Sequence, residues 1–191
     1  MCEIHEDGLG GHIQILERGD ETRPTVFRMV MPKGFGPPAP ERHPRQTEQF
    51  RVLRGRLDLG MVNGEHVVLD AGETFELPAN TYHHPKNGGD DELEFEATLT
   101  PGLDTAPMFV QLYTETREHS GFGQFARVAM AFRRYRNSIA FKQPVPLVMR
   151  LVSAVARGLG MRPTEPVPVE APQDQTSSSA RMRVDTSPSR L

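Results

Sequence analysis

Apolar and polar residues alternate along the first half of the chain, in short runs separated by turn residues. In residues 93–99, for example, Leu, Phe, Ala and Leu alternate with Glu, Glu and Thr. A period of two is typical of half-exposed β-strands. Asn63-Gly64, between two such runs, predicts a two-residue hairpin turn. Many short strands with turns between them predict an all-β sandwich or barrel, which we place at residues 12–101.

Beyond Pro101 the apolar residues recur at the spacing of an α-helix. Three stretches show this pattern, and they begin near Asp104, residue 123 and Leu147. We therefore expect a helical extension over residues 102–163, packed outside the strands.

The two ends of the chain lack both patterns. We expect residues 1–11 to be a flexible lead-in. From Thr164 onward Pro, Ser, Thr and Gln dominate and apolar residues are few. A segment of this kind has little to bury, so residues 164–191 are expected to be a disordered tail.

Composition narrows the class of protein. The length of 191 residues suits one domain with extensions, and the formal net charge of −3 argues against a nucleic-acid-binding protein. No apolar run is long enough to span a bilayer, so we expect no transmembrane segment. The single cysteine, Cys2, cannot form an internal disulfide, and residues 1–7 lack the apolar stretch of a signal peptide. We therefore expect a cytoplasmic protein.

Two clusters of polar residues lie within the predicted strands. The first contains Glu41, His43 and Glu48, and the second contains His83. Imidazole and carboxylate groups on neighbouring strands are what a divalent metal ion needs as ligands. Glu41 and His43 share a face of their strand, whereas Glu48 has the other parity and needs a turn or bulge at Pro44. We predict that these four residues hold one divalent metal, the alternative being polar residues on a solvated rim.

The two clusters resemble the signature motifs of the cupin superfamily, Gly-x5-His-x-His-x3-4-Glu-x6-Gly and Gly-x5-Pro-x-Gly-x2-His-x3-Asn. The resemblance covers residues 36–87, and the positions that keep the spacing are Glu48, Gly55, Gly72, Pro78, His83 and Asn87. It implies a mainly β fold, a double-stranded β-helix or jelly-roll barrel with C-terminal α-helices. The barrel followed by helices also resembles a group of small single-domain bacterial cupins with a helical C-terminal extension.

This chain departs from the cupin motifs at two positions. Glu41 stands where the first histidine of the family's motif would be, and Asn80 replaces a turn glycine. Asparagine tolerates a positive φ better than most residues, so the second change is mild. The first change makes Glu41 either a fourth ligand or a general base beside the metal. A shell with two carboxylates favours iron or manganese over zinc, nickel or copper.

Several functions remain open at this point. His43, Glu48 and His83 form the ligand set of a mononuclear oxygenase, which would make the chain an oxidoreductase such as a dioxygenase. A metal-assisted isomerase or cyclase with Glu41 as catalytic base is the second enzymatic interpretation. A non-catalytic small-molecule sensor or carrier, with its ligand in the barrel, is the alternative, and an interaction protein that works through its helices is another.

The helical extension carries an apolar stripe and many basic residues. The stripe of Val148, Leu151, Val152 and Val155 predicts a homodimer. The basic residues are either a solvated helix face or a patch for a membrane surface or an anionic partner. They are Arg117, Arg127, Arg133, Arg134, Arg136, Lys142, Arg150, Arg157 and Arg162.

Overall fold

A computed structural model describes residues 3–6 and 11–162 of the chain. The predicted disordered tail, residues 164–191, lies outside the described residues. The flexible lead-in predicted for residues 1–11 is wrong for Glu3–Glu6, which form strand β1 and pair with residues 12–15. Only Ile4 is apolar in this strand. An edge strand gains its hydrogen bonds from one neighbour and needs little apolar alternation to form.

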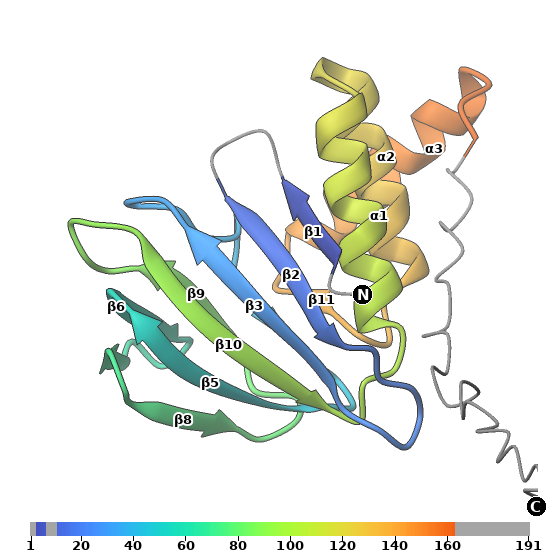
Figure 1. Ribbon diagram of the computed structural model, residues 1–191. Helices are drawn as coiled ribbons and strands as arrows, with labels where there is room; N and C mark the ends of the chain where they lie inside the picture. The colour runs from blue at the N-terminus through green and yellow to red at the C-terminus, as the bar shows by residue number, and fades with distance from the viewer. Residues whose placement is uncertain (1–2, 7–10, 163–191) are drawn as a thin grey trace, which may run out of the picture.

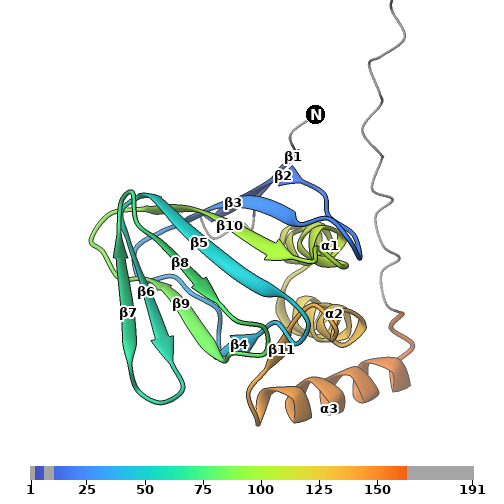
Figure 2. The same ribbon diagram turned by 90° about the horizontal axis from the view of Figure 1, so that it is seen from below.

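The strands form two antiparallel sheets (Figures 1 and 2). The first sheet has the order β1 (Glu3–Glu6), β2 (His12–Glu17), β3 (Thr25–Met31), β10 (Leu93–Thr100), β5 (Thr47–Arg54) and β8 (Thr74–Leu77). The second has the order β11 (Ala140–Phe141), β4 (Glu41–Arg42), β9 (His83–Asn87), β6 (Arg56–Met61) and β7 (His66–Asp70). Neighbours in each sheet are often far apart in the sequence, as in a jelly roll.

The alternation predicted from the sequence decides which side chains fill the barrel. Along β10, Leu93, Phe95, Ala97 and Leu99 are at most 2% exposed, whereas the residues between them are half-buried. The same inward faces of β5 and β6 add further buried apolar side chains to this core. The mainly β, double-stranded β-helix fold with C-terminal helices is therefore confirmed.

The helices are α1 (Thr105–Glu118), α2 (Gly121–Arg134) and α3 (Val145–Gly158). They lie along one side of the barrel, with α2 between the other two (Figure 2). Phe109 of α1 packs on Phe27 of β3, with ring centroids 4.7 Å apart. A second apolar core lies among the helices and β11, and it consists of Ala39, Met108, Ala129, Tyr135, Ile139, Phe141 and Met149.

The outer face of α3 is apolar and exposed. Leu147, Val148, Leu151, Val155 and Leu159 are between 43% and 70% exposed. Val148, Leu151 and Val155 of the predicted stripe are thus not covered by the described residues, whereas Val152 packs against the second core, and the homodimer stays a prediction. Among the described residues, no helix has both the length and the apolarity needed to cross a bilayer.

Candidate metal centre

The connection from β4 to β5 carries three of the four predicted ligands. Glu41 lies in β4, His43 follows it, and a turn at residues 44–45 leads into β5, where Glu48 points into the barrel. The turn predicted from the difference in parity is therefore present. His83, the first residue of β9, is paired directly with Glu41. Antiparallel pairing of β4 with β9 thus brings the two sequence clusters to one place.

The side chains of the four residues converge. Nε2 of His43 and Nε2 of His83 lie 3.2 Å and 3.0 Å from Oε2 of Glu48. One ligand atom each of Glu41, His43 and His83 lies within 4.8 Å of the others, and this group could hold a metal ion. His43, Glu48 and His83 are at most 5% exposed, and Glu41 is half-buried.

Two buried atoms at the centre of this group lack a conventional partner. Nε2 of His83 and Oε2 of Glu48 make no hydrogen bond of acceptable geometry within the described residues, although they are 3.0 Å apart. Buried polar atoms in folded proteins nearly always have a hydrogen-bond partner. A divalent ion accepts lone pairs from both atoms, so the residues present fit such an ion.

The other ring nitrogen of each histidine is held by a backbone carbonyl. Nδ1 of His43 lies 2.5 Å from the Ser138 carbonyl oxygen, and Nδ1 of His83 lies 3.1 Å from that of Thr81. A carbonyl oxygen only accepts, so each Nδ1 must carry the proton and donate it. In this tautomer the lone pair of each neutral Nε2 points at the centre, and metal-binding histidines usually donate their other ring N–H in this way.

Burial and the crowding of charges set the protonation of the metal-free site. Burial raises the pKa of Glu41 above its ordinary value. Burial also raises the pKa of Glu48, but the close contacts with His43 and His83 outweigh it and hold that pKa well below the usual range. Burial lowers the pKa of His83, yet the contact with Glu48 outweighs it and raises this pKa to about 9. Glu48 is therefore an anion, whereas Glu41 keeps its proton to higher pH.

The remaining motif residues support the geometry of this region. Asn80 has a φ of 70°, the conformation that a glycine at this position would adopt easily, and its N–H donates to the His43 carbonyl at 2.8 Å. Asn87 is buried and its amide donates to the carbonyls of Met31 and Asp91. His84 faces away from His83, and its Nε2 lies 2.7 Å from the Pro37 carbonyl oxygen.

Sequence reasoning missed the contribution of Ser138. This residue lies between α2 and β11 in the helical extension, and its backbone carbonyl oxygen contacts Nδ1 of His43. A backbone carbonyl has no signature in the residue type, so no motif could have identified it. The pairing of Phe141 in β11 with Glu41 in β4, which holds this segment against the site, joins residues that are also far apart in the chain.

Comparison with known proteins agrees with this geometry. Residues 27–100 match the family of cupin domains. The matched segment includes all four candidate ligands, so the barrel of this chain is similar to the cupin domain over the part that carries the site. It is 38% identical over 63 residues to germin-like protein 5-1 of Oryza sativa subsp. japonica, which is 31% of this chain and 28% of that protein. It is 39% identical over 62 residues to the rhicadhesin receptor of Pisum sativum, 30% of this chain and 28% of that protein.

Solved structures with a similar barrel include KdgF from a Halomonas species and an RmlC-like cupin from Shewanella frigidimarina. The first is 19% identical, with a TM-score of 0.46 over 55% of this chain and 92% of KdgF. The second is 20% identical, with a TM-score of 0.45 over 56% of this chain and 89% of the neighbour.

Proposed function

We propose that the chain is a metal-dependent enzyme that acts on a small organic molecule as a mononuclear oxygenase. The main support for this proposal is the convergence of three donor atoms. Nε2 of His43 lies 3.2 Å from Oε2 of Glu48, and Nε2 of His83 lies 3.0 Å from the same oxygen. Two imidazoles and one carboxylate form the ligand set of non-haem iron oxygenases, which keeps coordination positions open.

Each residue of the site has a definite role in this proposal. His43 and His83 bind through Nε2 because their Nδ1 protons are donated to the Ser138 and Thr81 carbonyls. Glu48 supplies the permanent negative charge. The metal, when bound, supplies Lewis acidity and, if it is iron or manganese, a redox couple for oxygen chemistry. Glu41 lies beside these ligands and either completes the shell or exchanges a proton with the substrate.

A second candidate function rests on Glu41 itself. Burial raises the pKa of its carboxyl, and general acid–base groups work best when their pKa is near the working pH. A metal-assisted isomerase or cyclase would use Glu41 to move a proton on the substrate. A non-catalytic sensor or carrier would use the same barrel without turnover.

The proposal extends to the location of the substrate, the oligomeric state and the compartment. We propose that the substrate enters the barrel beside the four ligands, and that the protein works as a cytoplasmic homodimer. The unit that binds metal and substrate is the barrel of residues 12–101, with residues 102–163 as the extension that supports it.

Oxygen uptake by iron-loaded protein, measured across a panel of phenols, thiols, diols and β-diketones, tests the proposal. We expect uptake that depends on one class of compound and disappears in His43→Ala. Conversion of a compound without oxygen uptake would favour the isomerase or cyclase. Binding of a compound without conversion would favour the carrier, and both results would contradict the oxygenase.

Glu41→Gln separates the two roles of that residue. If Glu41 is a ligand, metal content should fall, because an amide is a weaker ligand than a carboxylate. If it is a general acid or base, metal content should stay at the wild-type level while turnover falls by about 10²–10⁴-fold. Elemental analysis and turnover on the same preparation give both readouts. Wild-type metal content together with wild-type turnover would exclude both roles.

A further inference from the structure

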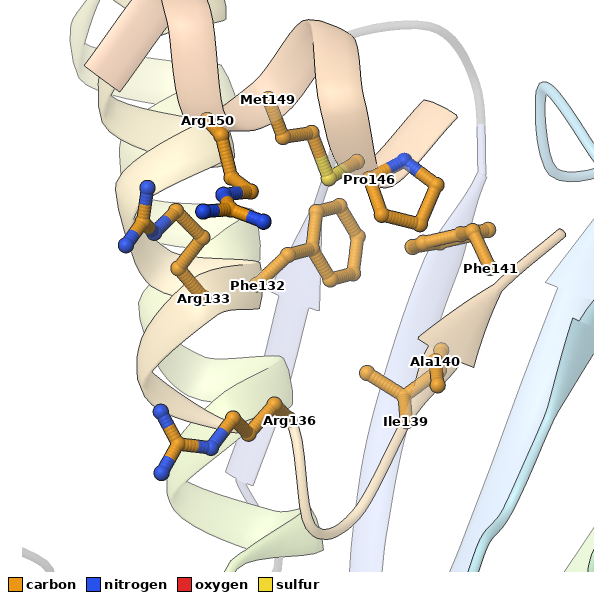
Figure 3. Close-up of a pocket in the computed structure, with 9 residues that line it drawn as sticks. All are labelled: Phe132, Arg133, Arg136, Ile139, Ala140, Phe141, Pro146, Met149 and Arg150. Atoms are coloured by element: carbon orange, nitrogen blue, oxygen red, sulfur yellow. The ribbon is translucent and has the colours of Figure 1, made fainter. Parts of the chain in front are cut away.

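A pocket of about 400 Å³ lies in the helical extension, between α2, β11 and α3 (Figure 3). Its volume is within the range of small-molecule sites in proteins, about 300–1,000 Å³. The residues that line it are Phe132, Arg133, Arg136, Ile139, Ala140, Phe141, Pro146, Met149 and Arg150. None of these is a candidate metal ligand, so the pocket is distinct from the site in the barrel.

One part of the pocket is apolar and is formed by side chains that pack on one another. The rings of Phe132 and Phe141 meet edge to face, with centroids 4.8 Å apart. Ile139, Phe141 and Met149 are buried. Figure 3 shows Met149 and Pro146 of α3 beside the two rings. This part of the pocket suits an alkyl chain or an aromatic ring.

The other part of the pocket is strongly basic. Arg133, Arg136 and Arg150 come from two segments of the chain, and Figure 3 shows them on the side of the pocket away from Phe141. No acidic residue lines the pocket. In the described part of the chain, none of the three guanidinium groups has a carboxylate partner, whereas several arginines on the barrel surface, such as Arg56 with Asp70, are paired.

Arg133, Arg136 and Arg150 are exposed, so solvent screens the repulsion among them, and their N–H donors are accessible to an anion. Guanidinium groups bind carboxylate and phosphate through paired N–H donors, more strongly than they bind neutral acceptors. A ligand that satisfies both halves of the pocket therefore has an anionic head and an apolar body. We propose that this pocket binds a small amphipathic anion, an alkyl or aryl phosphate or carboxylate.

Titration calorimetry with octyl phosphate tests the proposal, with inorganic phosphate and octanol as probes of head and body alone. We expect octyl phosphate to bind more tightly than either. In the series from butyl to octyl phosphate, affinity should rise by up to about fourfold for each added CH₂, the limit set by complete burial. Binding of inorganic phosphate as tight as that of octyl phosphate would show that the apolar half takes no part, and would overturn the proposal.

Paired charge variants locate the site. The double variant Arg133→Gln/Arg150→Gln should weaken octyl phosphate binding about tenfold or more, because two charge-assisted contacts are lost. The matched control Arg117→Gln/Arg157→Gln removes the same charge from exposed arginines outside the pocket and should bind as the wild type does. Equal binding by both double variants would overturn the proposal.

Two further experiments test whether octyl phosphate binds at the metal centre or whether the basic residues contact a membrane. Protein stripped of metal with a chelator should bind octyl phosphate with unchanged affinity, whereas loss of binding would assign the anion to the metal centre and contradict the proposal. Vesicles that contain phosphatidylglycerol test a membrane contact. Binding to these vesicles without binding of soluble octyl phosphate would make the basic residues a membrane surface and would also contradict it.

Discussion

The barrel and the helical extension differ in how completely they bury their apolar residues. In the barrel, the inward residues of β10 are at most 2% exposed and the outward positions of this strand are polar. In the extension, α3 buries Met149 and Ala156 but leaves five large apolar residues on or just after it 43–70% exposed. The barrel is a closed unit, whereas the extension has a second apolar face that is not covered by the described residues.

The two regions meet at the candidate metal centre. Glu41 in β4 pairs with His83 of the barrel on one side and with Phe141 of the extension on the other. The Ser138 carbonyl, also from the extension, holds the ring of His43. The extension is therefore more than a cover for the barrel. It holds the ring of His43, a candidate ligand whose sequence motif lies wholly in the barrel.

The pH dependence of metal binding should give the largest effect. The raised pKa of His83, about 9 against 6.5 for the free side chain, stabilises the metal-free fold below pH 6.5, and this stabilisation is lost as pH rises through 9. Metal binding needs neutral His83, so its affinity should rise about tenfold per pH unit in the same window. Competition with a calibrated chelator from pH 6.5 to 8.5 measures this rise. A flat profile would show that His83 is not a ligand.

Phe141→Ala tests how firmly the extension is attached. Phe141 is 5% exposed and packs on Phe132 next to β4. Removal of a buried ring costs about 3–5 kcal/mol of unfolding free energy. Urea denaturation should report this loss, and the metal affinity should fall as well, because β11 is paired with Glu41. Phe122→Ala, at a position that is 50% exposed, is the control and should change stability by only about 0.5 kcal/mol.

Leu151→Glu tests the proposed homodimer with the smallest change in the fold. Leu151 is 60% exposed at the centre of the apolar face of α3. A charge there should leave the unfolding free energy of the monomer nearly unchanged but oppose association. Light scattering at tens of micromolar should give the dimer mass for the wild type and for Val68→Glu, an exposed apolar position on β7, and the monomer mass for Leu151→Glu. A monomer mass for the wild type would contradict the proposed homodimer.

The sequence predicted the parts of the molecule that have a local signature. Alternation along β10 predicted a sandwich or barrel, and the resemblance to the cupin motifs narrowed this to a jelly-roll barrel with the ligand cluster. Asn63-Gly64 marked the hairpin between β6 and β7, but the connection runs over residues 62–65 and is not the two-residue turn that was predicted. The three helices were predicted from their period, but their buried faces were not. In α2, for example, Phe125 is 49% exposed, whereas Ala126 and Met130 are buried.

Features that depend on distant parts of the chain could not be predicted in this way. The pairing of Ala140–Phe141 with Glu41–Arg42 joins segments about a hundred positions apart, and two-residue strands have no periodicity. The contact of Ser138 with His43 uses a carbonyl that every residue possesses. The basic pocket arises from the packing of α3 on α2, which decides that only three of the nine basic residues of the extension line it.

The metal content of protein purified without chelator tests whether His43, Glu48, His83 and Glu41 form a metal centre. We expect about one divalent ion per chain in the wild type and in His66→Ala, an exposed histidine outside the site, and almost none in His83→Ala, where one of the buried donors is lost. All three proteins should first show the same circular dichroism spectrum. Full metal content in His83→Ala, or a wild type that binds no divalent ion when titrated with iron, manganese or zinc, would contradict the account.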